Sequence, residues 1–148
     1  EVAVEQVLKN IIILNRRIIK EKYANIFWDE MPIIKIEKTP LQQIFQNLIG
    51  NALKYHQPDQ YPEISIRYIQ DDHNWIFGVT DKGIGIESDY MEKIFIIFQK
   101  LHPKDQYEGT GMGLAICKKI LDRYEGKIWV DSKPNEGSTF YFFFVLLE

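Results

Sequence analysis

Two glycine-rich segments hold the residues of this sequence that are best suited to chemistry. The first is Asp-Lys-Gly-Ile-Gly-Ile at 81–86, and the second is Gly-Thr-Gly-Met-Gly-Leu at 109–114. Clustered glycines usually mark a left-handed backbone position or a close approach of the backbone to a ligand. The second cluster runs into an apolar helical pattern, and the free N–H groups of a helix start bind anions such as phosphate. The Asp81 carboxylate in the first cluster suits a donor such as an adenine amino group.

A polar stripe follows the helix that is predicted over residues 39–55. Asn47, Asn51 and Lys54 recur at helical spacing and therefore share one face of that helix. Amide oxygens and an ammonium on one face can hold Mg²⁺ and phosphate oxygens together, because Mg²⁺ takes few protein ligands. Tyr55 ends the stripe, where its ring can stack on a base. Alone, the stripe is typical of a solvated helix face and each glycine cluster of an ordinary turn, but the combination favours a nucleotide site.

The elements that must position these residues follow from the hydrophobic periodicity of the 148-residue chain. Helices are predicted over 4–18, 39–55 and 111–124, with Thr39 as N-cap, Pro40 in the first helical position and Gly126 as the glycine after the last helix. Strands are predicted over 24–28, 33–36, 64–68, 75–79, 128–130 and 139–147. This order predicts one α+β domain over 1–148, a two-layer sandwich in which three helices cover one face of a mixed, mostly antiparallel sheet.

Composition indicates a folded domain and argues against several other classes of protein. A hydrophobic content of 45% and an aromatic content of 14% are ample for a folded core. The net charge of -3 does not indicate a nucleic-acid partner. Cys117 is the single cysteine, so no internal disulfide is possible, and His56, His73 and His102 lack metal-ligand spacing. No apolar run reaches the roughly 18 residues of a membrane helix.

Five segments, in order along nearly the whole chain, resemble the motifs of one family. The segments are 47–55 (Asn-Leu-Ile-Gly-Asn-Ala-Leu-Lys-Tyr), 81–86, 94–98 (Ile-Phe-Ile-Ile-Phe), 109–116 and 137–140 (Gly-Ser-Thr-Phe). They are similar to the N, G1, F, G2 and G3 boxes of the ATP-binding catalytic domain of two-component sensor histidine kinases. That family shares a fold group with gyrase, Hsp90 and MutL. The stretches 98–102 and 107–111 are most similar to phytochrome-related kinases.

The resemblance implies a Bergerat-type fold and a site for Mg-ATP. It implies that Asn51 ligates Mg²⁺ between the phosphates, with Asn47 supporting it one turn earlier. Lys54 would reach a phosphate and Tyr55 would cover the adenine. Asp81 would accept a hydrogen bond from the adenine N6 amino group.

The resemblance also assigns roles around the base and the phosphates. Gly83 and Gly85 would let the backbone close on the base, Ile86 would pack against it, and Thr139 would lie near Asp81. Residues 100–108 would form an ATP lid. Lys100 is expected to bind phosphate. The other residues expected to bind ATP in the lid hinge and the following helix start are Gly109, Thr110, Gly111, Met112, Gly113 and Leu114. One departure is Lys82, which stands where the G1 box usually has asparagine.

None of the three histidines has the acceptor context of the family, a histidine followed by an acidic residue at the head of a long helix. We therefore expect no catalytic residue in this chain and a dimerisation and phosphoacceptor domain just N-terminal to Glu1. The expected partners are that domain and a response regulator, with no nucleic acid. The fragment is expected to be monomeric and cytoplasmic, and the full protein to be a homodimer that is either cytoplasmic or anchored in the inner membrane.

Alternative functions within the fold group are a stand-alone ATPase or switch of the gyrase and Hsp90 type, and an anti-sigma-type serine kinase. Both tend to carry a carboxylate in the N box, where this chain has Asn47. An amide cannot take a proton from water, so Asn47 predicts poor hydrolysis. A degenerate module that only binds nucleotide is a further alternative, although no box is broken.

Overall fold

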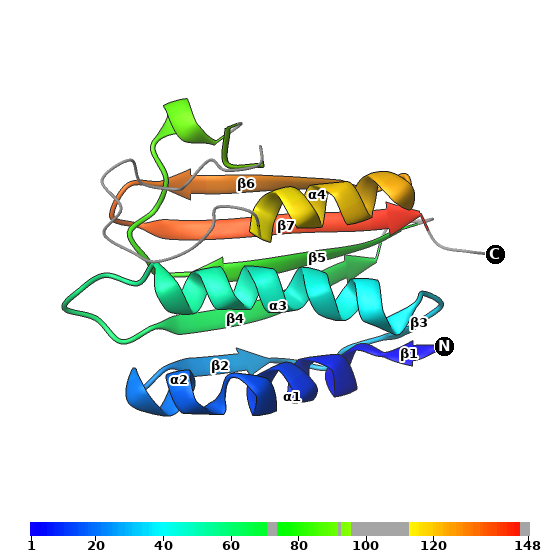
Figure 1. Cartoon of the computed structure of the whole chain (residues 1–148), viewed down its shortest axis with the longest axis horizontal. Coiled ribbons are helices and arrows are strands. Elements are labelled where there is room, and N and C mark those ends of the chain that lie inside the picture. The colour runs from blue at the N-terminus through cyan, green and yellow to red at the C-terminus, as the bar shows by residue number, and fades with distance from the viewer. Residues whose placement is uncertain (71–73, 92, 96–112, 146–148) are drawn as a thin grey trace.

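The computed structural model describes residues 1–70, 74–91, 93–95 and 113–145. Two layers make up the molecule, with helices lying on one face of a sheet (Figure 1). The elements in chain order are β1 (Val2–Ala3), α1 (Val4–Leu14), α2 (Arg16–Glu21), β2 (Asn25–Trp28), β3 (Ile33–Ile34), α3 (Lys38–Lys54), β4 (Glu63–Gln70), β5 (Asn74–Asp81), the 3₁₀ turns η1 (Ser88–Tyr90) and η2 (Lys93–Phe95), α4 (Gly113–Arg123), β6 (Lys127–Lys133) and β7 (Gly137–Val145).

The main sheet has five strands in the order β2-β4-β5-β7-β6. Only the β2–β4 pair of this sheet is parallel, and the other three pairs are antiparallel. The short strands β1 and β3 pair with each other in a separate ribbon. The expected α+β sandwich with a mixed, mostly antiparallel sheet is therefore confirmed.

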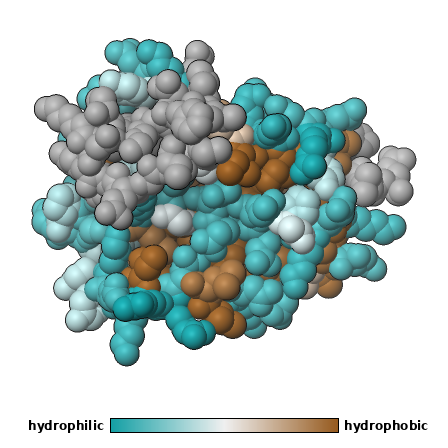
Figure 2. Space-filling view, in the orientation of Figure 1, coloured by the Kyte–Doolittle hydropathy of each residue, from teal (hydrophilic) through white to brown (hydrophobic). Residues whose placement is uncertain are grey.

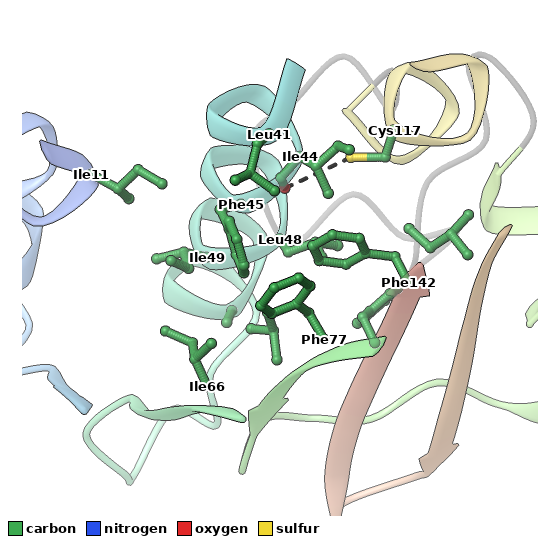
Figure 3. Close-up of a cluster of buried hydrophobic side chains, with 14 of the residues drawn as sticks. Ile11, Leu41, Ile44, Phe45, Leu48, Ile49, Ile66, Phe77, Cys117 and Phe142 are labelled. Atoms are coloured by element: carbon green, nitrogen blue, oxygen red, sulfur yellow. Dashed lines mark hydrogen bonds between the residues drawn. The ribbon is translucent and has the colours of Figure 1, made fainter. Parts of the chain in front are cut away.

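The core lies between α3 and the central strands. Phe45 of α3 packs edge-on against Phe77 of β5 and Phe142 of β7, with ring centroids 5.5 and 5.2 Å away. Figure 3 shows these rings facing the side chains of α3, with Ile11 of α1 and Cys117 of α4 on either side. Each large apolar side chain buried here contributes about 1.5–3 kcal/mol. This packing fixes α3, which carries the polar stripe, over the middle of the sheet.

The single helix predicted over 4–18 is divided in the structure into two helices. It breaks at Asn15, whose backbone (φ -107°, ψ 11°) leaves the helical region, and α2 follows. The Asn15 side chain donates to the Ile11 carbonyl at 2.8 Å, a local bond that competes with helix continuation. Leu14 and Ile18, which the pattern placed on the core face, are 66% and 43% exposed. Figure 2 shows apolar patches among hydrophilic residues in the lower part of the view, where Figure 1 places α1 and α2.

Two predicted helix caps are also wrong. α3 begins at Lys38, so Glu37 rather than Thr39 stands at the N-cap, and it makes no side-chain capping bond. After α4, Glu125 takes the left-handed conformation (φ 56°) expected of Gly126. Gly126 is needed for a different reason, since a Cβ there would overlap the Phe143 carbonyl oxygen. Within the described ranges, none of the helices combines the length and the apolar character needed to cross a bilayer.

Candidate nucleotide-binding site

Asp81 ends β5 and lies on the face of the sheet that the helices cover. Positions 77, 79 and 81 lie on the same face of the strand, because side chains alternate along it, and Phe77 and Val79 are both buried in the core. The Asp81 Oδ1 accepts a hydrogen bond from the Gly83 N–H at 2.8 Å. Burial raises the pKa of Asp81 to about 6, opposed by hydrogen bonds from the backbone N–H groups of Gly83 and Ser138. At neutral pH the group is therefore mostly an ionised acceptor.

The loop after β5 passes so close to other backbone that only glycine fits at two positions. A Cβ at Gly83 would overlap the Tyr55 carbonyl oxygen, which also accepts the Ile84 N–H at 3.1 Å. Gly85 has φ 75°, and a Cβ there would overlap the Lys133 carbonyl oxygen. The first glycine cluster thus wedges its loop between the end of α3 and the β6–β7 turn.

The polar stripe of α3 faces the start of α4. The Asn47 Oδ1 lies 3.1 Å from the point that a Cβ on Gly113 would occupy, so Gly113 allows the first turn of α4 to approach α3. Asn47 also hydrogen-bonds Cys117, whose pKa burial raises to about 12. Leu114, the next residue of α4, is buried. The structure therefore brings Asn47 together with the described end of the second glycine cluster.

Further along α3, Asn51 and Lys54 are half-buried. The Lys54 ammonium lies 5.2 Å from the centre of the Tyr55 ring, within cation–π range. Tyr55 is the residue after the last turn of α3 and packs partly against the core. The stripe thus ends beside the Gly83 loop, because the Tyr55 carbonyl is the contact point between them.

Ile86 is buried near the site, whereas Thr139 lies on the face of the sheet opposite Asp81. Ile86 is buried, and its N–H donates to the Ser132 Oγ at 2.8 Å. Thr139 pairs with Thr80 across β5 and β7, and their hydroxyl oxygens lie 3.0 Å apart on the face of the sheet opposite Asp81. The neighbour of Asp81 on its own face is Ser138.

Ser138 and Ser132 are site residues that the sequence analysis missed. Both are buried, and their hydroxyl oxygens lie 2.7 Å apart. Ser132 donates to the Gly137 carbonyl at 2.9 Å, so it accepts from the Ser138 hydroxyl and from the Ile86 N–H. The alternation of β7 held the signal for Ser138, because a strand that buries Phe140 also buries the residue two positions earlier.

The remaining expected site residues lie outside the described part of the chain. These are Lys100, Gly109, Thr110, Gly111 and Met112, together with the lid expected over 100–108. Of the F box, Ile94 is buried and Phe95 packs edge-on against Phe140 with centroids 6.3 Å apart. No cluster of three or more His, Cys, Asp or Glu side chains able to hold a metal occurs in the described residues. An amide such as Asn51 supplies the hard oxygen that Mg²⁺ accepts when phosphates and waters complete its shell.

Comparison with known proteins identifies the family. Residues 36–148 match the model of the histidine kinase-, DNA gyrase B- and HSP90-like ATPases. The phytochrome-like protein Cph1 of Synechocystis is 45% identical over 139 residues, which are 94% of this chain and 18% of that protein. Cyanobacterial phytochrome A of Nostoc is 46% identical over 142 residues, 96% of this chain and 18% of that protein. The chain therefore spans about a fifth of the length of these relatives.

Solved structures show the same fold. The nucleotide-free catalytic domain of the histidine kinase ThkA is 25% identical with a TM-score of 0.80, covering 98% of this chain and 93% of that one. Full-length ShkA in complex with AMPPNP is 27% identical with a TM-score of 0.82, covering 99% of this chain and 31% of that one. The chain belongs to the histidine kinase-, DNA gyrase B- and HSP90-like ATPase family, and within it to the ATP-binding catalytic domains of two-component sensor histidine kinases, of the phytochrome-related type.

Proposed function

We propose that this chain binds Mg-ATP and donates the γ-phosphoryl group to a histidine on a separate dimerisation and phosphoacceptor domain of the same protein. The observation that carries the proposal is the placement of Asp81. It is a largely buried carboxylate beside the glycine loop, and that loop contacts the carbonyl of Tyr55, where the polar stripe of α3 ends. A buried carboxylate beside a glycine loop, whose backbone carries no side chains, suits the amino group at the edge of an adenine base.

Each described residue has a role in this proposal. The ionised Asp81 carboxylate accepts from the adenine amino group, and the Gly83 N–H keeps that carboxylate oriented. Gly83 and Gly85 bring bare backbone to the base, and Tyr55 covers it. Lys54 and the first turn of α4, which begins at Gly113, face the phosphates.

The metal has a defined place in the same proposal. Asn51 offers its amide oxygen to Mg²⁺, and Asn47 supports the site one turn earlier on α3. Bound Mg²⁺ would supply charge neutralisation for the phosphates. The protein itself contributes position and electrostatics, since phosphoryl transfer needs the acceptor held in line with the γ-phosphate.

A kinase fits the N box better than an ATPase does. Asn47 stands where an ATPase of this fold group has its carboxylate base, and its amide hydrogen-bonds Cys117 and lies beside Gly113. Such a group cannot activate water. We propose accordingly that the acceptor domain lies outside this chain, that the full protein is a homodimer, and that a response regulator takes the phosphoryl group from the histidine.

The test is phosphorylation with γ-labelled ATP. We expect the chain alone to gain no stable label, and to label a separately expressed phosphoacceptor domain of the same protein slowly, because the reaction becomes bimolecular. The label should be acid-labile and base-stable, as phosphohistidine is. Self-labelling of this chain, or hydrolysis at many turnovers per second, would instead establish the serine kinase or the ATPase alternative.

A further inference from the structure

Gln57 lies two residues after Tyr55, in the segment that leaves α3. Its side-chain nitrogen Nε2 points at three backbone carbonyls from two distant segments. It donates to the carbonyl of Asn135 at 3.1 Å and to that of Gly83 at 3.2 Å, with the Lys82 carbonyl at 3.5 Å. An amide nitrogen carries two hydrogens, so the two shorter contacts use both and the Lys82 contact is shared.

Gly83 is consequently held at both ends. Its N–H donates to the Asp81 carboxylate at 2.8 Å, and its carbonyl accepts from Gln57. A residue fixed at both its N–H and its carbonyl cannot turn about its own φ and ψ without breaking one of the two bonds. The direction of the Gly83 N–H, and with it the orientation of the Asp81 carboxylate, therefore depends on Gln57.

Among the described residues, each backbone hydrogen bond between these segments joins two of them. The Ile84 N–H donates to the Tyr55 carbonyl at 3.1 Å, and the Asn135 N–H donates to the Ile84 carbonyl at 2.8 Å. Gln57 adds bonds from the α3 exit to both the β5 exit loop and the β6–β7 turn. It thus links all three segments that surround the loop with one half-buried side chain.

We propose that Gln57 is a positioning residue for base recognition: by holding the Gly83 and Asn135 carbonyls it keeps the Asp81 carboxylate in the orientation that selects adenine. The inference rests on the proposed function, in which Asp81 receives the adenine amino group. Gln57 acts on the base through Asp81 and Gly83. Its loss should therefore weaken the discrimination between adenine and guanine more than the binding of the triphosphate.

Three substitutions separate hydrogen bonding from packing. Gln57→Met keeps the length without a donor, and Gln57→Glu keeps the shape but faces three carbonyls with a carboxylate. Gln57→Lys restores donors, since an ammonium carries three. Gln60→Met changes an exposed glutamine of the same loop and is the matched control.

The first measurement is the affinity for Mg-ATP and Mg-GTP by titration calorimetry. Losing two neutral hydrogen bonds should lower the ATP affinity about 5- to 30-fold in the methionine variant, and more in the glutamate variant. GTP affinity should change less, so the ATP/GTP ratio falls. Gln57→Lys should recover most of that ratio, and Gln60→Met should leave it unchanged. An unaltered ratio in a folded Gln57→Met variant would overturn the proposal.

The second measurement needs no nucleotide, and so separates a failure of this inference from a failure of the proposed function. The amide proton of Gly83, followed by NMR against pH, should titrate with Asp81 in the wild type and with a smaller amplitude in Gln57→Met. An equal amplitude in both would refute the positioning role even if the chain bound no ATP. Should the methionine variant not fold, Gln57→Asn takes its place, because the shorter amide cannot reach both carbonyls.

Discussion

Asn15 and Gln46 exchange two amide hydrogen bonds between the α1–α2 junction and α3. Asn15 Nδ2 donates to Gln46 Oε1 at 2.8 Å, and Gln46 Nε2 donates to Asn15 Oδ1 at 3.2 Å. Asn15 is 8% exposed, so water cannot readily replace its partner. This reciprocal pair anchors the N-terminal helices to the residue that precedes Asn47.

Removing one member of this pair should leave the other without its partner at a mostly buried site. Asn15→Ala is expected to lower the free energy of unfolding by about 1–3 kcal/mol. The double variant with Gln46→Ala should lose less than the sum of the single variants, as urea denaturation in a double-mutant cycle would show. The exposed pair of Gln6 and Asn10 is the control, and Asn10→Ala should cost less than about 0.5 kcal/mol. Equal losses at Asn15 and Asn10 would contradict a role for burial.

Two glycine-to-alanine substitutions should change the free energy of unfolding in opposite directions. Gly85→Ala places a Cβ against the Lys133 carbonyl at φ 75°, so it should lower the free energy of unfolding by at least about 2 kcal/mol. Gly50→Ala lies in α3, where the nearest atom to the new Cβ is Gln46 Nε2 at 3.8 Å. It should stabilise the chain by up to about 1 kcal/mol. Thermal denaturation of both variants tests the pair, and a stable Gly85→Ala variant would show that the loop can move.

Asp81→Asn should raise the stability of the fold while it weakens the binding of ATP. The folded chain holds the Asp81 proton up to about pH 6, whereas a free aspartate loses it near 3.8. Between these values a rise in pH ionises the unfolded chain first, so the carboxylate lowers stability as pH increases and has no such effect below about 4. The variant should therefore gain up to about 3 kcal/mol over wild type at pH 8 and nothing at pH 4. Urea denaturation across that range would reveal a pH-independent difference if burial were not the cause.

The same substitution should weaken ATP binding, because an amide can present a donor to the adenine amino group. Two facing donors leave both unsatisfied, at a cost of about 1–3 kcal/mol. Wild-type affinity for ATP should fall as pH drops through about 6, when the carboxylate becomes protonated, and the Asp81→Asn variant should not show this dependence. GTP should bind wild type poorly, since guanine offers an acceptor at the same position. Equal affinities for the two nucleotides would argue against Asp81 as the base-recognition residue.

Asn51→Ala should remove most of the Mg²⁺-dependent part of ATP affinity. The amide oxygen is the one metal ligand that we assign to this chain, and alanine is compatible with the helix at that position. Calorimetry with ATP, with and without Mg²⁺, isolates the metal contribution. Gln43→Ala, an exposed change earlier on α3, should leave it intact. A full Mg²⁺ effect in Asn51→Ala would place the metal elsewhere.

The order of elements and the glycine loop could be predicted because they depend on local pattern. Alternation marked the strands around Phe77 and Phe142, and the spacing of Asn47 and Asn51 put both on one face of a helix. The break at Asn15 could not be predicted from periodicity, because the Asn15 amide bonds a partner 31 positions away on α3 as well as the Ile11 carbonyl. Local periodicity carries no information about such contacts.

Within the site, Thr139 shows how one residue of register decides a prediction. The Gly-Ser-Thr-Phe motif contains two hydroxyl residues, Ser138 and Thr139, whose side chains lie on opposite faces of β7. The pairing with β5 shows that Ser138 accompanies Asp81. The role of Gln57 was invisible for a similar reason, since its acceptors come from carbonyls at 82, 83 and 135. Every residue has a backbone carbonyl, so the residue types at these positions do not indicate which carbonyls accept a hydrogen bond from Gln57.

The parallel pairing of β2 with β4 has a consequence for how the chain opens. Parallel neighbours cannot be joined by a tight turn, so the connection between them runs through α3. Because strands on both sides of α3 in the sequence pair with each other, α3 cannot leave the sheet without separating them, and we expect its inner backbone amides to exchange with solvent only when the whole domain unfolds. The helix that carries Asn47 and Asn51 is then among the slowest-exchanging parts of the molecule, and it offers any nucleotide a surface that needs no ordering on arrival.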